Sequence, residues 1–84
     1  MYTVLLHKQA LKDLEKLKRA RLSGKAEALK NILAEDPFVP PFEKLSGTTP
    51  TIYSRRINIQ HRMTYTVDAE THVVKILRMW THYE

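Results

Sequence analysis

Cysteine is absent from this sequence, and glycine is rare in it. Without cysteine the chain can form no disulfide, no thiolate nucleophile and no cysteine-ligated zinc site, which is typical of a protein in a reducing compartment. The two glycines, Gly24 and Gly47, stand too far apart for a glycine-rich phosphate loop. Spacings of the HxxH, HExxH and acidic calcium-loop types are missing as well. We therefore expect neither a metal site nor a cofactor.

Long apolar runs are also missing. A helical membrane span needs about 20 predominantly apolar residues, and the N-terminal run Tyr2–Leu6 is far shorter. The charged leader and small-residue cleavage site of a signal peptide are not seen either. We therefore expect a cytoplasmic protein with no membrane contact. A chain of 84 residues should form one domain, 1–84, with a core too modest to enclose a large cofactor.

Acidic residues are the minority among the charged ones. Fourteen lysines and arginines against nine aspartates and glutamates give a net charge of +5, and the isoelectric point is near 9.7. Such an excess on a small domain favours polyanionic partners, of which nucleic acid is the commonest. A lysine-rich, solvated helix surface would give the same count. The placement of the arginines therefore matters more than their number.

The spacing of apolar residues predicts one strand and then two helices. Tyr2–Leu6 is rich in β-branched and apolar residues, as strands are. From Lys8 the apolar residues recur at helical spacing, with Asp13 and the other charged residues on the remaining faces. After a break at residues 21–24, a second amphipathic helix continues to Asp36. Pro37 ends it, because proline disfavours the α conformation in the residue before it.

Residues 37–50 form a long connection that is dense in proline. Irregular connections of this length are uncommon in compact domains and indicate either function or disorder. The prolines stiffen the segment, and Phe38, Phe42 and Leu45 could anchor it. We expect an ordered functional loop.

The remaining sequence reads as three strands, residues 52–59, 62–67 and 72–80, separated by short polar turns. Turns this short join antiparallel neighbours. The predicted fold is therefore α+β, with element order β-α-α-β-β-β. Its two helices should pack on one face of a small antiparallel sheet and leave the other face open.

Side-chain alternation places two arginines on that open face. Ile57 lies on the apolar side of its strand and Arg56 on the opposite side, while Met63 and Arg62 divide in the same way on the next strand. Arg56 and Arg62 should therefore meet near one hairpin end. Arg55 falls on the apolar side, so we expect it near the sheet edge or paired with a carboxylate.

A carboxylate in the loop and a histidine near the C-terminus could complete an active site with these arginines. Glu43 could accept the proton of a ribose 2′-hydroxyl while His82 protonates the leaving 5′-oxygen, so RNA would be cleaved without a metal. Guanidinium groups would neutralise the charge that develops on the phosphate. Taken alone, each residue also has a plainer interpretation: Glu43 as a solvated charge, the arginines as a surface pair, and His82 and Tyr83 as packing.

Three segments together resemble a known family. They are Phe42–Leu45, Tyr53–Tyr65 and the terminal Trp80–Tyr83, which contains adjacent histidine and tyrosine. In these segments, and in the element order over nearly the whole chain, the sequence resembles the Txe/YoeB group of the RelE/ParE toxin superfamily. Members are toxins of bacterial type II toxin–antitoxin pairs that cut messenger RNA in the ribosomal A site.

The resemblance implies a RelE-like fold and a role for each matching residue. Glu43 would be the general base, His82 the general acid, and Tyr83 would orient the substrate. The phosphate-stabilising pair would be Arg56 and Arg62. Lys44 and Arg55 would contact RNA. Members commonly carry a lysine just after the loop leucine, where this chain has Ser46, so Lys44 is the candidate to supply that charge.

The function implied is that of a ribosome-dependent, metal-independent mRNA endoribonuclease that inhibits translation. Its partners would be an acidic antitoxin, the ribosome with its RNA, and messenger RNA, while homodimer formation stays open. One alternative is a non-catalytic poison of the same fold, like the ParE branch that inhibits gyrase, but that branch lacks residues matching Glu43 and His82. Another is a plain RNA-binding module, which the few, scattered aromatic residues argue against.

Overall fold

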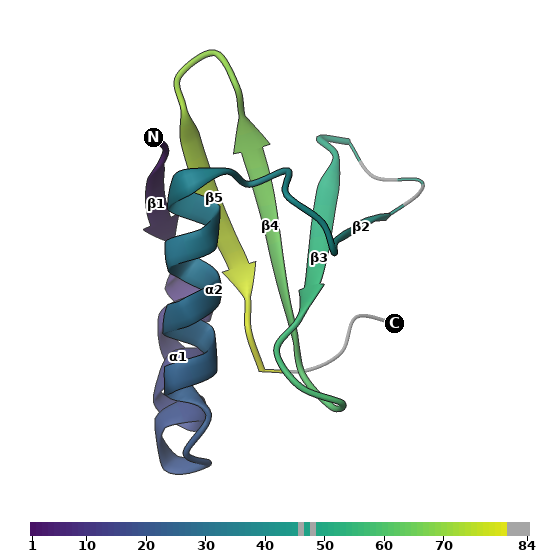
Figure 1. The fold of residues 1–84 in the computed structure, drawn as a ribbon. Helices are drawn as coiled ribbons and strands as arrows, with labels where there is room; N and C mark the ends of the chain where they lie inside the picture. Colours follow the sequence, from purple (N-terminus) through teal and green to yellow (C-terminus); the bar gives the residue numbers. More distant parts are fainter. Residues whose placement is uncertain (46, 48, 81–84) are drawn as a thin grey trace.

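A computed structural model of the chain describes residues 1–45, 47 and 49–80. In this part of the chain two helices pack on one face of a five-stranded sheet (Figure 1). The elements in chain order are β1 (Thr3–Leu6), α1 (Lys8–Arg19), α2 (Ser23–Glu35), β2 (Glu43–Leu45), β3 (Ile52–Arg56), β4 (Arg62–Asp68) and β5 (Val73–Arg78). The predicted α+β class and the placement of both helices on one face are confirmed.

The sheet is mixed rather than wholly antiparallel. Its strand order is β1-β5-β4-β3-β2, and β1 runs parallel to β5 with Thr3 opposite Val73. β3, β4 and β5 are antiparallel neighbours, as their short turns predicted, and β2 is antiparallel to β3. The expectation of a purely antiparallel sheet was wrong because β1 and β5 are joined by almost the entire chain, and no local turn dictates their relative direction.

Two element boundaries also differ from the prediction. The proline-rich connection contains a short strand, β2, in which Glu43 lies opposite Ser54. The first strand of the meander ends at Arg56 instead of residue 59. Beyond it, the side-chain oxygen of Asn58 accepts hydrogen bonds from the backbone of Gln60 and His61, which closes a tight turn before β4.

The core lies between the helices and the sheet, and residues from both layers form it. The fully buried apolar side chains include Leu17 of α1, Leu33 of α2 and Tyr65 of β4. The period-2 alternation of β4 and β5 brings Met63, Tyr65, Val74 and Ile76 to this side.

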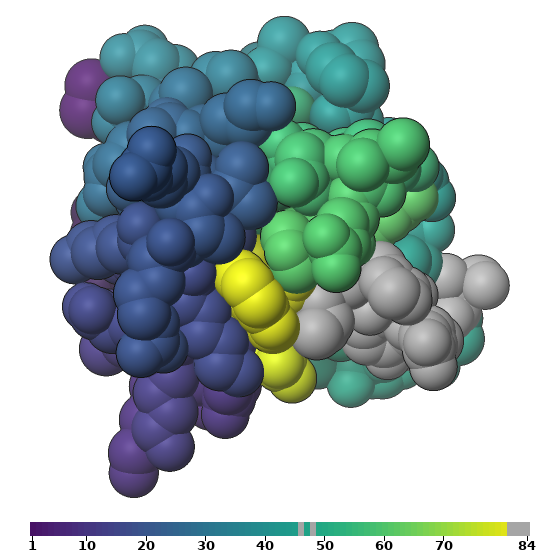
Figure 2. All heavy atoms as spheres, turned by 90° about the horizontal axis from the view of Figure 1, so that it is seen from below, coloured from purple at the N-terminus to yellow at the C-terminus, as the bar shows by residue number. Residues whose placement is uncertain are grey.

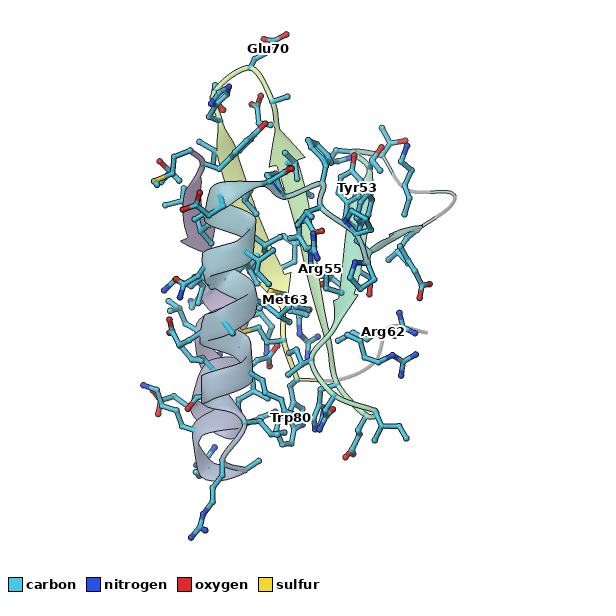
Figure 3. The ribbon with its side chains drawn as sticks, viewed as in Figure 1. Tyr53, Arg55, Arg62, Met63, Glu70 and Trp80 are labelled. Carbon is cyan, nitrogen blue, oxygen red and sulfur yellow. The ribbon has the colours of Figure 1, made fainter. Side chains whose placement is uncertain are left out.

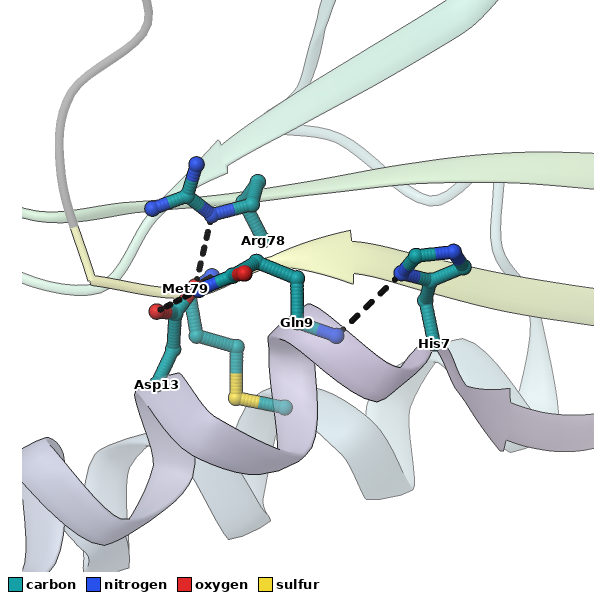
Figure 4. A network of polar contacts seen from close by, with 5 residues as sticks. All are labelled: His7, Gln9, Asp13, Arg78 and Met79. Carbon is teal, nitrogen blue, oxygen red and sulfur yellow. Dashed lines mark hydrogen bonds and ion pairs between the residues drawn. The ribbon is translucent and has the colours of Figure 1, made fainter.

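One acidic side chain lies inside this core. Asp13 was predicted on the polar faces of the first helix, but its side chain is fully buried. Its carboxylate accepts hydrogen bonds from Arg78 Nε at 2.8 Å, from the backbone nitrogen of Met79 at 3.0 Å and from Gln9 Nε2 at 3.4 Å (Figure 4). The prediction failed because two of these partners, Arg78 and Met79, come from the far end of the chain. The contacts tie the end of β5 to α1.

A second contact holds the chain just after β5. The ring of Trp80 stacks on that of His61, with centroids 4.2 Å apart. Seen from below, the end of β5 (yellow) emerges between the helices and the green residues around the β3–β4 turn (Figure 2). Position 80 is therefore fixed beside the turn that leads into Arg62. Within the described residues, neither helix is long and apolar enough to cross a membrane.

Candidate active site

An ion pair across three strands forms the centre of the candidate site. β2 places Glu43 at the sheet edge, and its Oε1 lies 2.9 Å from Nη1 of Arg62, the first residue of β4. Arg62 stands directly opposite Arg56 on β3. The expected meeting of the two arginines is therefore confirmed, on the face opposite the helices. Glu43 lies beside them because β2 pairs with β3. The prediction of a loop over residues 37–50 did not include this strand pairing.

The arginines determine the ionisation of Glu43. The hydrogen bond from Arg62 and its positive charge lower the pKa of the Glu43 carboxyl. Desolvation opposes this effect, and the charge of Arg56 adds a smaller contribution to it. The Glu43 side chain is 64% exposed, whereas that of Arg62 is 21% exposed. The carboxylate is consequently ionised at neutral pH and reachable from solvent, as a general base must be.

A cavity adjoins this cluster. It has a volume of about 530 Å³ and extends from the charged residues toward α2. Its polar lining is Glu43, Ser54, Arg55, Arg56 and Arg62, and its apolar lining is Leu29, Ile32, Val39, Pro40, Pro41 and Phe42. Two guanidinium groups at the edge of a cavity suit an anion such as a phosphodiester, since each can donate two hydrogen bonds to it.

Arg55 does not belong to the charged cluster. Its side chain is 3% exposed and points to the helix side of β3 (Figure 3). The expected position at the sheet edge is correct, because β2 pairs with β3 only as far as Ser54. The alternative expectation, a carboxylate partner, is not seen among the described residues: the guanidinium donates to backbone carbonyls and to a tyrosine hydroxyl. Arg55 also lines the cavity beside Glu43, and its role as an RNA contact stays a prediction.

Lys44 also lies apart from Glu43. It pairs with Tyr53, whereas Glu43 pairs with Ser54, so the pleat of β2 turns the two side chains to opposite faces. Lys44 is exposed, and its role as an RNA contact stays a prediction. His82 and Tyr83 lie outside the described residues, and their catalytic roles stay predictions as well.

Two residues without an assigned role have a notable position. Ser54 is buried between Glu43 and Thr64 in the register, and its Oγ has no hydrogen-bond partner among the described residues. The alternation that placed Arg56 on this face placed Ser54 there too. His61 directly precedes Arg62 and stacks on Trp80; nothing in the sequence pattern indicated that contact.

A metal centre finds no support in the described part of the chain. Among residues 1–45, 47 and 49–80, no group of three or more histidine, aspartate or glutamate side chains lies close enough together to hold an ion.

Comparison with known proteins identifies the family. The model of the ParE toxin family, from the type II toxin–antitoxin system parDE, matches residues 4–84. No curated protein gives a significant match. The YoeB/ParE toxin from Agrobacterium tumefaciens has a similar structure, with a TM-score of 0.85 and 26% identity over 96% of this chain and 99% of that one.

Two further solved structures agree. The YoeB dimer from Staphylococcus aureus superposes with a TM-score of 0.81 and is 28% identical, over 98% of each chain. The toxin in the archaeal RelE–RelB complex from Pyrococcus horikoshii gives a TM-score of 0.79 and 30% identity, over 95% of this chain and 93% of that one. The resemblance stated from the sequence is thereby confirmed. This chain belongs to the ParE toxin family of type II toxin–antitoxin systems, within the RelE/ParE superfamily, and is YoeB-like among its members.

Proposed function

We propose that this toxin is a ribosome-dependent endoribonuclease that cleaves messenger RNA in the ribosomal A site and thereby stops translation. The ion pair between Glu43 and Arg62, with Arg56 opposite, is the observation that best supports the proposal. It combines an ionised carboxylate with two cations at one accessible place. General-base removal of a proton beside a phosphate needs both.

In the proposed reaction the scissile phosphate binds between Arg56 and Arg62. When Arg62 also binds the phosphate, it stabilises the charged form of Glu43 less. The carboxylate therefore becomes a stronger base when substrate is present. Glu43 takes the 2′-hydroxyl proton, the 2′-oxygen bonds to phosphorus, and the bond from phosphorus to the 5′-oxygen breaks. We assign His82 to protonate that oxygen and Tyr83 to orient the substrate. The products are a 2′,3′-cyclic phosphate and a 5′-hydroxyl.

The partners proposed are an antitoxin and the ribosome. Related toxins were solved in complex with their antitoxins, as YoeB–YefM from Staphylococcus aureus and RelE–RelB from Pyrococcus horikoshii. With a charge of +5, this chain would attract an acidic antitoxin segment that folds on binding, as well as ribosomal RNA. Its place of action would be the cytoplasm. A homodimer is a further candidate assembly, since a YoeB dimer is known.

Substituting the proposed base tests the reaction directly. Glu43→Gln keeps the size and polarity of the side chain but cannot accept the proton, so cleavage of a translated message should fall by about 100-fold or more. Primer extension on the message measures the cuts. Glu70→Gln is the matched control, because Glu70 is exposed in the β4–β5 turn at the opposite end of the sheet (Figure 3). Full cleavage by the Glu43 variant would contradict the assignment.

A second candidate function is a non-catalytic poison. The match to the ParE family model favours it, whereas the Glu43–Arg62 pair has no evident use in such a protein. The two functions separate in cells that express the Glu43→Gln variant. A nuclease loses growth arrest with this substitution, and a poison that acts by binding alone retains it.

A further inference from the structure

Resting on the proposed nuclease function, we propose that Arg55 is a positioning residue, whose buried guanidinium holds residues 37–42 in place and so sets the Glu43 carboxylate against Arg62. Arg55 lines the cavity beside Glu43, but its hydrogen bonds run to residues 37–41 and to Tyr65 rather than to Glu43. It acts through the backbone of the segment that leads into β2.

The contacts of Arg55 converge on that one segment. Its Nη1 donates to the carbonyl of Pro41 at 3.1 Å, and its Nη2 donates to the carbonyls of Pro37, at 3.3 Å, and of Val39. Its Nε donates to the hydroxyl of Tyr65 at 3.1 Å, and that hydroxyl in turn donates to Pro37 at 3.1 Å. Three carbonyls within five residues thus depend on one side chain.

Burial makes this dependence strong. A charged group taken out of water is destabilising unless its donors are satisfied. No carboxylate partners Arg55 among the described residues, so the backbone carbonyls, together with Tyr65, replace its lost water. If the segment moved, a buried cation would lose its hydrogen-bond acceptors. If the cation were removed, the buried carbonyls would lose their donor. The two are therefore coupled.

The constraint reaches almost to Glu43 itself. Pro41, whose carbonyl is held, lies two residues before Glu43, and the ring of Phe42 lies 5.7 Å from the guanidinium carbon of Arg55. Phe42 also packs edge-on against Tyr53 of β3. Little backbone freedom is left between these anchors and the carboxylate. In a catalytic site a displacement of about 1 Å can lower the rate about 100-fold.

The two consecutive arginines of β3 accordingly have different proposed roles. Arg56 faces the proposed phosphate site beside Arg62, whereas Arg55 faces the helix side and holds the loop. Lysine cannot replace Arg55, since its three donors radiate from a single atom, whereas the guanidinium spreads five donors in a plane.

The experiment uses the full-length variants Arg55→Lys and Tyr65→Phe, and measures two quantities. The first is ribosome-dependent cleavage, split into kcat and KM. The second is the pKa of Glu43, read from an NMR titration of its side-chain carboxyl. For Arg55→Lys we expect kcat to fall about 10- to 100-fold with KM nearly unchanged, and the Glu43 pKa to rise as its contact with Arg62 loosens. Tyr65→Phe keeps the cation but removes one link, so both effects should be smaller.

Val74→Ala is the control for a merely structural role. Val74 is fully buried in β5 and stands opposite Val4 of β1 and Val67 of β4, so its truncation should lower the urea midpoint while leaving kcat and the Glu43 pKa unchanged. If Arg55→Lys does not fold, the Tyr65→Phe variant decides the matter alone. Normal kcat and a normal Glu43 pKa in the folded variants would overturn the inference.

Failure of the proposed function would be visible separately. If Glu43→Gln cleaves RNA normally, the nuclease assignment fails. The NMR titration needs no activity, and it would still report whether Arg55 holds Glu43 against Arg62.

Discussion

The carboxylate of Glu43 is exposed, and its ionisation is governed by its neighbours rather than by burial. Arg62 donates to it at 2.9 Å, and Arg56 adds positive charge from the adjacent strand. A lowered pKa makes Glu43 a weak base in the free toxin, but one that is always ionised near neutral pH. In the proposed reaction the arriving phosphate competes for Arg62, so basicity increases when the substrate is bound.

This electrostatic account predicts a titration. In the free toxin the pKa of Glu43 should lie below the usual glutamate value of about 4.3, because Arg62 stabilises the charged form. Arg62→Gln should raise it, and an NMR titration of the carboxyl carbon measures both. Asp68 is the internal control, since its pKa is lowered by hydrogen bonds from Thr71 and Glu70 and should not respond. An unchanged Glu43 pKa in the variant would show that the ion pair is not formed in solution.

At the scale of elements, Asp13 joins α1 to the end of β5. Burial by itself raises the pKa of Asp13, but the hydrogen bonds from Arg78, Met79 and Gln9, with the charge of Arg78, outweigh it and lower the pKa overall. The chain continues from this junction through Trp80 into residues 81–84. Asp13 therefore fixes the point from which the proposed general acid, His82, departs.

Asp13→Asn should destabilise the fold in a pH-dependent way. Replacing the charged acceptor should lower the unfolding free energy by about 2 kcal/mol at neutral pH, since hydrogen bonds to charged groups contribute about 1.5–3 kcal/mol and Arg78 is partly exposed. The folded pKa is depressed, so the stabilisation is present above the unfolded pKa of about 3.9 and is lost as the pH falls through the folded pKa. Urea unfolding at several pH values measures it.

Glu15→Gln is the matched control on the same helix. Glu15 forms an exposed ion pair with Lys18 at 3.4 Å, and such surface pairs contribute little. Its substitution should change stability by less than about 0.5 kcal/mol. If the difference in unfolding free energy between the native protein and the Asp13→Asn variant stayed constant down to pH 2, it would not arise from the ionisation of Asp13.

At the scale of the whole molecule, a charge of +5 on a body with a radius of gyration of 11.8 Å favours binding to RNA. Binding to ribosomes should weaken as monovalent salt increases, because each phosphate contact releases counterions. For about four such contacts, the affinity should fall roughly 50-fold between about 50 and 200 mM salt. Sedimentation with ribosomes at constant magnesium measures this.

An uncharged osmolyte serves as the control for that measurement. Sucrose at matched osmolality should leave ribosome binding unchanged, because it does not compete for phosphates. Binding that is indifferent to salt would mean that apolar contacts dominate, and the basic surface would then need another explanation.

Much of the architecture could be predicted from local patterns. Apolar spacing indicated both helices, and short turns indicated the antiparallel meander. Alternation along the strands placed Arg56 and Arg62 together, because a period of two residues decides which side chains share a face. The resemblance in Phe42–Leu45, Tyr53–Tyr65 and Trp80–Tyr83 indicated the family, which the comparisons confirmed.

The remaining features depend on contacts between residues far apart in the chain. Arg55 meets carbonyls 14 to 18 residues away, Asp13 meets Arg78 and Met79 across 65 and 66 residues, and β1 pairs with β5 at the other end of the sequence. By itself the sequence determined the two helices, the antiparallel meander and the shared face of Arg56 and Arg62, since these follow from periodicity and short turns. Only the tertiary structure decided which charges are buried and what holds them, since desolvation and its compensation arise when distant segments pack together.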